Sequence, residues 1–151
     1  APAAYPASAT ATGGGGGVQA AFASGGCDGA VRVWRIADSG EIKADEAFER
    51  AYKDASHSGW VRDVAWAPSI GLPGQCVASC AEDKLVHIWV QHPTGAWTCK
   101  RLPPFEAVVW RLSWSVAGNV LAVSAGDGKV TLWKEGLDGE WRLLEALNDA
   151  A

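Results

Sequence analysis

The stretch VASCAEDKLVHIW, residues 77–89, decides the fold of this chain, because two near copies of it occur elsewhere. The copies are FASGGCDGAVRVW at residues 22–34 and LAVSAGDGKVTLW at residues 121–133. In each copy the seventh residue is an aspartate and the thirteenth a tryptophan, and the copies recur after 55 and then 44 residues. These residues are Asp28, Asp83 and Asp127, with Trp34, Trp89 and Trp133. Such a period indicates a repeat architecture.

Each repeat is expected to form four short strands. Within a copy, a polar turn around the aspartate separates two apolar stretches, which predicts a β-hairpin. Another strand-like stretch lies ahead of the second and third copies, at residues 61–66 and 109–114, and a further one begins behind them at Trp97 and Trp141. A four-stranded unit of about 40–45 residues with this Trp-Asp rhythm is typical of one blade of a WD-repeat β-propeller. We therefore predict an all-β fold with three such blades.

The front of the chain and one insertion depart from the regular repeat. Residues 1–17 are rich in Ala, Pro, Ser and Thr and end in five glycines, so they are expected to form a loop. The first blade is then expected to lack its innermost strand. Residues 38–58 carry mixed charges and are expected to be a solvated surface excursion, with a strand near residues 47–52. The expected divisions are 18–54 for the rest of the first blade, 55–103 for the second, 104–147 for the third and 148–151 for a tail.

The second unit has a histidine, a serine, an aspartate and a tryptophan at the places where a WD blade can form one buried hydrogen-bond chain. They are His57, Ser79, Asp83 and Trp89. An indole N–H donates, a carboxylate accepts, and the hydroxyl and imidazole do both, so all four can be satisfied together. The first unit keeps Ser24, Asp28 and Trp34, and the third keeps Asp127 and Trp133.

The same residue types serve in nucleophilic catalysis, but a catalytic triad gives no reason for partial copies at a fixed period. The third unit has Val123 in the serine position and Phe105 in the histidine position. We therefore assign these residues to the blade and predict no catalytic residue.

Composition narrows the class of protein further. The net charge is −4 and the basic residues are scattered, which argues against binding to a phosphate backbone. The longest apolar runs fall well short of the roughly 18–20 residues that span a membrane, and the composition is typical of a soluble, cytosol-facing protein. The four cysteines form no CxxC pair, so we predict reduced thiols that are buried or half-buried, with no metal and no cofactor.

Three stretches closely resemble the C-terminal blades of the SEC-thirteen family. They are HSGWVRDVAWAP at 57–68, CVASCAEDKLVHIWV at 76–90 and VWRLSWSVAGNVLAVSAGDGKVTLWKE at 109–135. The resemblance covers residues 18–145. It implies the C-terminal half of an open, six-bladed propeller with no catalytic activity, in which the third unit here is the last blade.

The resemblance also implies partners. In that family a partner chain inserts a blade of its own into the ring. One such partner is a subunit of the outer cage of the COPII coat, for transport from the endoplasmic reticulum to the Golgi. Another belongs to the Y-shaped scaffold of the nuclear pore, and a third association is with a complex that regulates nutrient signalling. The expected locations are the cytoplasmic face of the endoplasmic reticulum and the nuclear pore, with membrane contact only through the assembly.

The aromatic inner strand of the last blade is a candidate docking surface for the inserted blade. Trp110, Leu112 and Trp114 alternate along residues 109–114, so they are expected to share one face. Large aromatic side chains are frequent binding anchors. The alternative is that this face packs against the preceding blade of the same chain.

Two other functions fit a WD propeller, because the fold hosts many. One is a sister adaptor, such as the other open propeller of the pore scaffold or a factor that delivers iron–sulfur clusters. Both of these adaptors contain a motif similar to WVRDVAW, but they match residues 118–135 less well. The other is the substrate receptor of a ubiquitin ligase, which predicts an accessory domain elsewhere in the parent protein.

Overall fold

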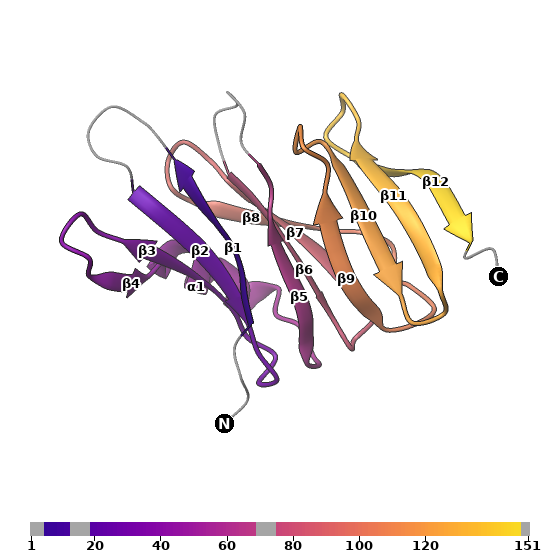
Figure 1. The fold of residues 1–151 in the computed structure, drawn as a ribbon, viewed down its shortest axis with the longest axis horizontal. Coiled ribbons are helices and arrows are strands. Elements are labelled where there is room, and N and C mark those ends of the chain that lie inside the picture. The colour runs from indigo at the N-terminus through magenta and orange to yellow at the C-terminus, as the bar shows by residue number, and fades with distance from the viewer. Residues whose placement is uncertain (1–4, 13–18, 69–74, 149–151) are drawn as a thin grey trace.

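The computed structural model describes residues 5–12, 19–68 and 75–148, which form twelve strands and one helix. The strands are grouped in three antiparallel sheets of four, in the orders β1-β2-β3-β4, β5-β6-β7-β8 and β9-β10-β11-β12. Figure 1 shows the three sheets following one another across the molecule, from β1–β4 in purple to β9–β12 in orange and yellow. The predicted fold class, a partial WD-type propeller built of four-stranded blades, is confirmed.

The bounds of the elements follow the repeat. The first sheet contains β1 (Tyr5–Thr12), β2 (Gln19–Gly25), β3 (Val31–Ile36) and β4 (Ile42–Ala44), and is followed by α1 (Glu46–Asp54). The second contains β5 (Val61–Trp66), β6 (Gln75–Ala81), β7 (Val86–Gln91) and β8 (Trp97–Arg101). The third contains β9 (Val109–Trp114), β10 (Val120–Ala125), β11 (Lys129–Glu135) and β12 (Trp141–Asn148). In the described part of the chain, α1 is too short to cross a membrane.

The repeat aspartates build the three hairpin turns. In each turn the aspartate Oδ1 accepts a hydrogen bond from the backbone N–H two residues on, at 3.0–3.1 Å. The residue directly after each aspartate has a positive φ, which glycine adopts without strain. It is Gly29 (φ 78°) in the first turn and Gly128 (φ 79°) in the third, but Lys84 (φ 66°) in the second. The turn chemistry therefore explains why the aspartate recurs.

The first sheet differs from the expectation. Residues 1–17 were predicted to form a loop, but β1 pairs with β2 from Tyr5↔Gly25 to Thr12↔Gln19 and supplies the fourth, inner strand. The physical reason is the edge of β2, whose N–H and C=O groups need partners. A stretch rich in Ala, Ser and Thr can satisfy them without an alternating pattern. Pro6 is tolerated because β1 is an edge strand.

The strand predicted near residues 47–52 is a helix instead. Asp45 caps α1, and its Oδ1 accepts a hydrogen bond from the Phe48 N–H at 3.1 Å. Glu46 and Glu49 lie in the first turn, where the helix dipole favours acidic side chains. Phe48 and Tyr52, one turn apart, stack with ring centroids 6.1 Å apart. The segment is also less solvated than expected, since Phe48 is fully buried.

The hydrophobic core consists of two layers, one on each face of the second sheet. Because neighbouring residues of a strand point to opposite faces, Val77 and Trp89 pack toward the first sheet, whereas Ala78 and Ile88 pack toward the third. Phe48 of α1 joins the first layer. Each sheet is thus held by the apolar face of its neighbour.

Candidate functional site

The structure brings the four residues of the predicted hydrogen-bond chain together. The Trp89 indole Nε1–H donates to Ser79 Oγ at 3.2 Å, and Ser79 Oγ lies 2.8 Å from His57 Nε2. His57 Nδ1 lies 2.9 Å from Asp83 Oδ2. An ionised carboxylate only accepts, so Nδ1 carries the proton, Nε2 accepts from the serine hydroxyl, and each donor has one acceptor. The chain links the loop before β5 to β6, β7 and the turn between them.

Burial sets the protonation states in this chain. The side chains of His57 and Asp83 are 0% and 4% exposed. Burial lowers the pKa of His57 and outweighs the opposing effect of Asp83, so the imidazole is neutral. For Asp83, burial acts to raise the pKa, but hydrogen bonds from His57, Ser58 N–H and Leu85 N–H prevail and lower it.

The buried position of Ser79 shows what this arrangement does. Its side chain is fully buried, and its oxygen accepts a hydrogen bond from the Trp89 indole. A nucleophile must reach its substrate, and this hydroxyl is sealed between β6, β7 and the His57 ring. The chain therefore ties strands together within one blade.

The other two units contain shorter versions of the same contacts. In the first, the Trp34 indole donates to Ser24 Oγ at 3.0 Å, while Asp28 only caps its turn and pairs with Arg32. In the third, Trp133 donates instead to Thr131 Oγ1 at 2.8 Å. Phe105 occupies the place of the histidine there, with its ring edge-on to Trp133 at a centroid distance of 6.0 Å. Asp127 accepts from the Lys129 N–H in its turn.

The candidate docking residues on β9 do not share a free face. Leu112 is 6% exposed and lies in the core between the second and third sheets. Its backbone N–H donates to Asp63 Oδ2 at 2.9 Å, and the Trp114 indole donates to the Ala65 carbonyl at 3.0 Å. These bonds join β9 to β5 of the preceding sheet. At Leu112 and Trp114 the structure therefore agrees with the alternative, in which this strand packs against the preceding blade of the same chain.

Trp110 is the exposed member of that set, at 46%. Arg111 pairs with Ser124 and Val109 with Ala125, so Trp110 is the extra residue of a bulge in β9 and leaves the face of Leu112. Its ring lies under the Arg62 guanidinium at 4.6 Å, and Arg62 in turn pairs with Glu82. Trp110 thus caps the junction with the second sheet while keeping nearly half of its surface free.

A second exposed surface on the third sheet escaped the sequence analysis. We define the open flank as the face of the third sheet that carries Ala122, Val130 and Leu132. All three are half-buried, whereas Leu121, Val123 and Trp133 on the opposite face are buried against the second sheet. The signal was present in the repeat, because each of these residues has a counterpart in the earlier copies.

The cysteines are free thiols, and most of them are covered. Burial raises the pKa of Cys76 to about 12 and of Cys99 to about 11, and also raises that of Cys80. Cys27 is exposed in the turn after β2, contrary to the expectation of at least half-burial. Within residues 5–12, 19–68 and 75–148, no cluster of three His, Cys, Asp or Glu side chains is arranged to hold a metal ion.

Comparison with known proteins places this architecture in a family. A family model described as "WD domain, G-beta repeat" matches residues 50–90 and 97–134. The chain is 48% identical over 129 residues to "Protein SEC13 homolog" of Homo sapiens and 49% identical over 121 residues to the protein of that name in Dictyostelium discoideum. It is 49% identical over 127 residues to "Protein transport protein SEC13 homolog B" of Arabidopsis thaliana.

These matches include most of this chain but a minority of each relative. They cover 84%, 80% and 83% of the chain, and 38%, 38% and 40% of the human, Dictyostelium and Arabidopsis proteins. The chain thus spans about two fifths of the length of these relatives. The matched repeats, the three four-stranded sheets and the Trp-Asp turns agree, so the chain belongs to the WD domain, G-beta repeat family, in which the relatives it resembles are SEC13 homologues.

Proposed function

We propose that this chain forms the last blades of a non-enzymatic scaffold subunit in a protein-transport assembly, whose ring is completed by a blade from a partner chain. The assembly is the COPII coat, for transport from the endoplasmic reticulum to the Golgi. The same subunit also serves the Y-shaped scaffold of the nuclear pore and the nutrient-signalling complex. Three relatives have names that begin with "Protein transport protein", which supports the transport role.

The observation that carries this proposal is the open flank of the third sheet. The residue before each repeat tryptophan lies on the same face of its sheet: Val33, Ile88 and Leu132. Val33 and Ile88 are 0% exposed, because the next sheet covers each of them, whereas Leu132 is half-buried.

The alanines paired with these residues repeat the contrast. Ala23 faces Val33 across the strands, Ala78 faces Ile88 and Ala122 faces Leu132. Ala23 and Ala78 are fully buried, and Ala122 is not. The third sheet therefore presents the same apolar pattern that binds a neighbouring blade at the two earlier positions.

A four-stranded sheet is the occupant that fits the open flank. At the two earlier positions the pattern of a small alanine beside a branched residue packs against the inner strand of the next sheet. Face-to-face packing of β-sheets buries such alternating apolar residues in a layer about 10 Å thick. The resemblance to an open ring supports a blade donated in trans, and a blade of the same polypeptide is the alternative.

The proposal is tested with the full-length parent protein carrying Leu132→Asp, which places a charge in the centre of the open flank. The matched control is Leu137→Asp, in the turn between β11 and β12, where the side chain is fully exposed. We expect affinity purification from the parent cells to recover coat-cage and pore-scaffold subunits with the wild type and the control, but not with Leu132→Asp. A buried unpaired charge costs several kcal/mol, enough to prevent docking.

Three results would count against the proposal. Equal recovery of partners by Leu132→Asp would remove the open flank as the docking surface. A marked fall in the Tm of the purified, partner-free Leu132→Asp protein would show that a blade of its own chain covers this flank. Recovery of ubiquitin-ligase or iron–sulfur components instead of coat subunits would leave the fold unchanged and replace the function.

Trp110→Ala tests whether Trp110, the exposed aromatic residue of β9, belongs to the surface that docks the partner. Trp110 stacks on Arg62 at the other side of the third sheet, so we expect this substitution to reduce partner recovery less than Leu132→Asp does. A loss of recovery equal to that of Leu132→Asp would instead extend the docking surface to Trp110.

A further inference from the structure

The outer rim of the junction between the first and second sheets is closed by the start of α1. The Asp45 carboxylate accepts two hydrogen bonds from Arg35, from Nε at 3.1 Å and from Nη2 at 3.0 Å. The same oxygen accepts the Trp97 indole N–H at 3.3 Å. An acidic residue, a cation and an indole N–H thus form one network at this rim.

The aromatic residue three positions after Asp45 completes the closure. The Phe48 ring lies 5.0 Å from the ring of Trp89 and meets the Trp97 ring edge-on at 5.2 Å. Phe48 is fully buried, and Trp97 is only 5% exposed. The Asp-x-x-Phe start of the helix therefore binds the polar and the apolar part of Trp97 at once.

The junction between the second and third sheets contains a tryptophan equivalent to Trp97, but no helix start among the described residues binds it. Trp141 follows Trp133 by eight residues, as Trp97 follows Trp89. The Trp141 Nε1 is buried, yet no described side chain or backbone group accepts its hydrogen. The connection here, residues 102–108, is less than half as long as residues 45–60 at the first junction, so no helix covers the indole.

Lys100 lines the same pocket as Trp141 and supplies a positive charge there. Cys99 pairs with Trp89, as Ala44 pairs with Trp34, so Lys100 takes the position that Asp45 has at the first junction. The chain thus places an ammonium here where the first junction has a carboxylate. The Lys100 ammonium contacts the Gly139 carbonyl and lies 3.6 Å from the Glu135 carboxylate in a half-exposed pair. Such an exposed pair contributes little and is readily exchanged.

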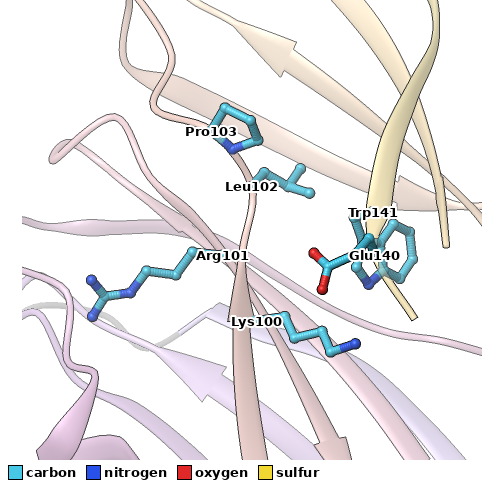
Figure 2. A pocket seen from close by; sticks show the side chains of 6 residues that line it. All are labelled: Lys100, Arg101, Leu102, Pro103, Glu140 and Trp141. Atoms are coloured by element: carbon cyan, nitrogen blue, oxygen red, sulfur yellow. The ribbon is translucent and has the colours of Figure 1, made fainter. Parts of the chain in front are cut away.

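A pocket of about 410 Å³ opens between these groups. It is lined by Lys100, Arg101, Leu102, Pro103, Glu140 and Trp141. Figure 2 shows the side chains of Lys100, Glu140 and Trp141 on one side of the β8 backbone, while the Arg101 guanidinium extends to the other. The volume lies within the range of protein ligand sites, and apolar Leu102 and Pro103 adjoin the polar groups.

We propose that this pocket binds a short helical segment of a partner protein that begins with an aspartate and carries an aromatic residue three positions later. The carboxylate accepts the Trp141 indole N–H and pairs with Lys100, as Asp45 accepts from Trp97 and pairs with Arg35. The aromatic ring packs on the Trp141 ring and Leu102, as Phe48 packs on Trp97. Glu140 is the one opposing charge in the lining.

This site is independent of the open flank, because it lies at the opposite face of the third sheet. A carboxylate is favoured over a neutral acceptor because hydrogen bonds to a charged group, supported by an ammonium, are roughly twice as strong. A partner that binds here would therefore be selected by both charge and shape, and could bind while a blade occupies the open flank.

The test uses a fluorescein-labelled peptide of residues 43–56 of this chain, KADEAFERAYKDAS, and the full-length parent protein. Fluorescence anisotropy measures its Kd up to about 1 mM, since so short a helix binds weakly. We expect saturable binding that weakens roughly tenfold for Trp141→Phe, through loss of a hydrogen bond to a carboxylate. Lys100→Gln should weaken binding in the same direction, and Glu140→Gln should tighten it.

Matched controls show where the peptide binds. Peptides with Asp45→Asn or Phe48→Ala should bind roughly tenfold more weakly, because each lacks one half of the motif. Trp97→Phe in the protein should leave the Kd unchanged if the peptide occupies the second junction rather than displacing α1 from the first. Lys100→Gln alters a half-exposed side chain, so it keeps the test valid if Trp141→Phe lowers the Tm.

Three outcomes would overturn the proposal. The first is no saturable binding by the folded wild-type protein. The second is an unchanged Kd for both Trp141→Phe and Lys100→Gln. The third is a loss of binding with Trp97→Phe alone, which would show that the peptide replaces α1 and that the pocket beside Trp141 is not its site.

Discussion

The imidazole rings of His57 and His87 stack face to face, with centroids 4.0 Å apart and planes inclined by 13°. His57 belongs to the hydrogen-bond chain of the second blade, whereas His87 lies on β7 and is 0% exposed. Arg101 is the residue opposite His87 on the neighbouring strand β8, and Asp83 contacts the His57 ring through Nδ1. Two neutral rings stack well here, but a proton on either one would face the other ring and Arg101.

This pair predicts acid lability. Burial, with smaller effects of His57 and Arg101, lowers the pKa of His87 to about 3, and burial also lowers that of His57. The unfolded chain takes up protons near pH 6.5 and the folded chain only at lower pH. The stability from these neutral rings is therefore complete above pH 6.5 and falls as the pH drops toward 3, by up to about 5 kcal/mol for His87.

Urea unfolding of the parent protein between pH 7 and pH 4 checks this expectation. We expect the midpoint to fall steadily, and His87→Phe, which keeps the stacking but cannot titrate, to remove much of that fall. His92→Gln is the control, because His92 is exposed and its imidazole Nε2 lies at hydrogen-bond distance from the Thr98 hydroxyl. A fall of the same size with His87→Phe would contradict the assignment.

The repeat aspartates should differ in their contribution to stability. Asp83→Ala leaves the buried His57 Nδ1–H without an acceptor, so we expect a loss of about 2–4 kcal/mol. Asp28→Ala removes a turn hydrogen bond and an exposed pair with Arg32, so we expect about 1 kcal/mol or less. Chemical unfolding of the two variants measures the difference, and equal losses would show that the turn, not the hydrogen-bond chain, dominates.

Helix α1 should depend on one side chain. Phe48→Ala creates a cavity beside Trp89 and Trp97, and we expect a loss of about 3–5 kcal/mol with faster hydrogen exchange in α1. Arg50→Ala, on the exposed face of the same helix, should change stability by less than about 0.5 kcal/mol. If amide hydrogen exchange in α1 is equally fast in the two variants, the helix is held by its cap rather than by Phe48.

The second hairpin turn carries avoidable strain. Lys84 has φ 66°, a conformation that its counterparts Gly29 and Gly128 adopt freely. Lys84→Gly should therefore raise the free energy of unfolding by about 0.5–1 kcal/mol, after allowance for the greater entropy of glycine in the unfolded chain. Lys84→Ala keeps the strain and serves as the comparison. A glycine variant no more stable than the alanine variant would refute the strain.

Local features of the fold were readable from the repeat. The spacing of aspartate and tryptophan predicted the hairpins, because the Asp turn and the alternating strands are set by neighbouring residues. The same spacing placed His57, Ser79, Asp83 and Trp89 in one blade, and the structure joins them through three hydrogen bonds. The family was readable as well, from the same copies.

Segments without a repeat counterpart were not predictable in this way. Residues 5–12 have no alternating pattern, and they form a strand only because β2 offers an unpaired edge. The helix at Glu46–Asp54 depends on a cap and on a buried phenylalanine whose partners lie about 40 residues away in the chain. Helix and strand compete closely in such short stretches, so tertiary contacts decide.

The sequence by itself determined the three blades, their turns and the buried hydrogen-bond chain, since these depend on residues that lie close together in each repeat. Only the tertiary structure decided which faces stay free. A bulge at Trp110 breaks the alternation that placed Trp110 on the face of Leu112, and packing against the second sheet takes up Leu112 and Trp114. The open flank and the pocket beside Trp141 depend on how neighbouring sheets and connections of unequal length pack, and no local pattern encodes that packing.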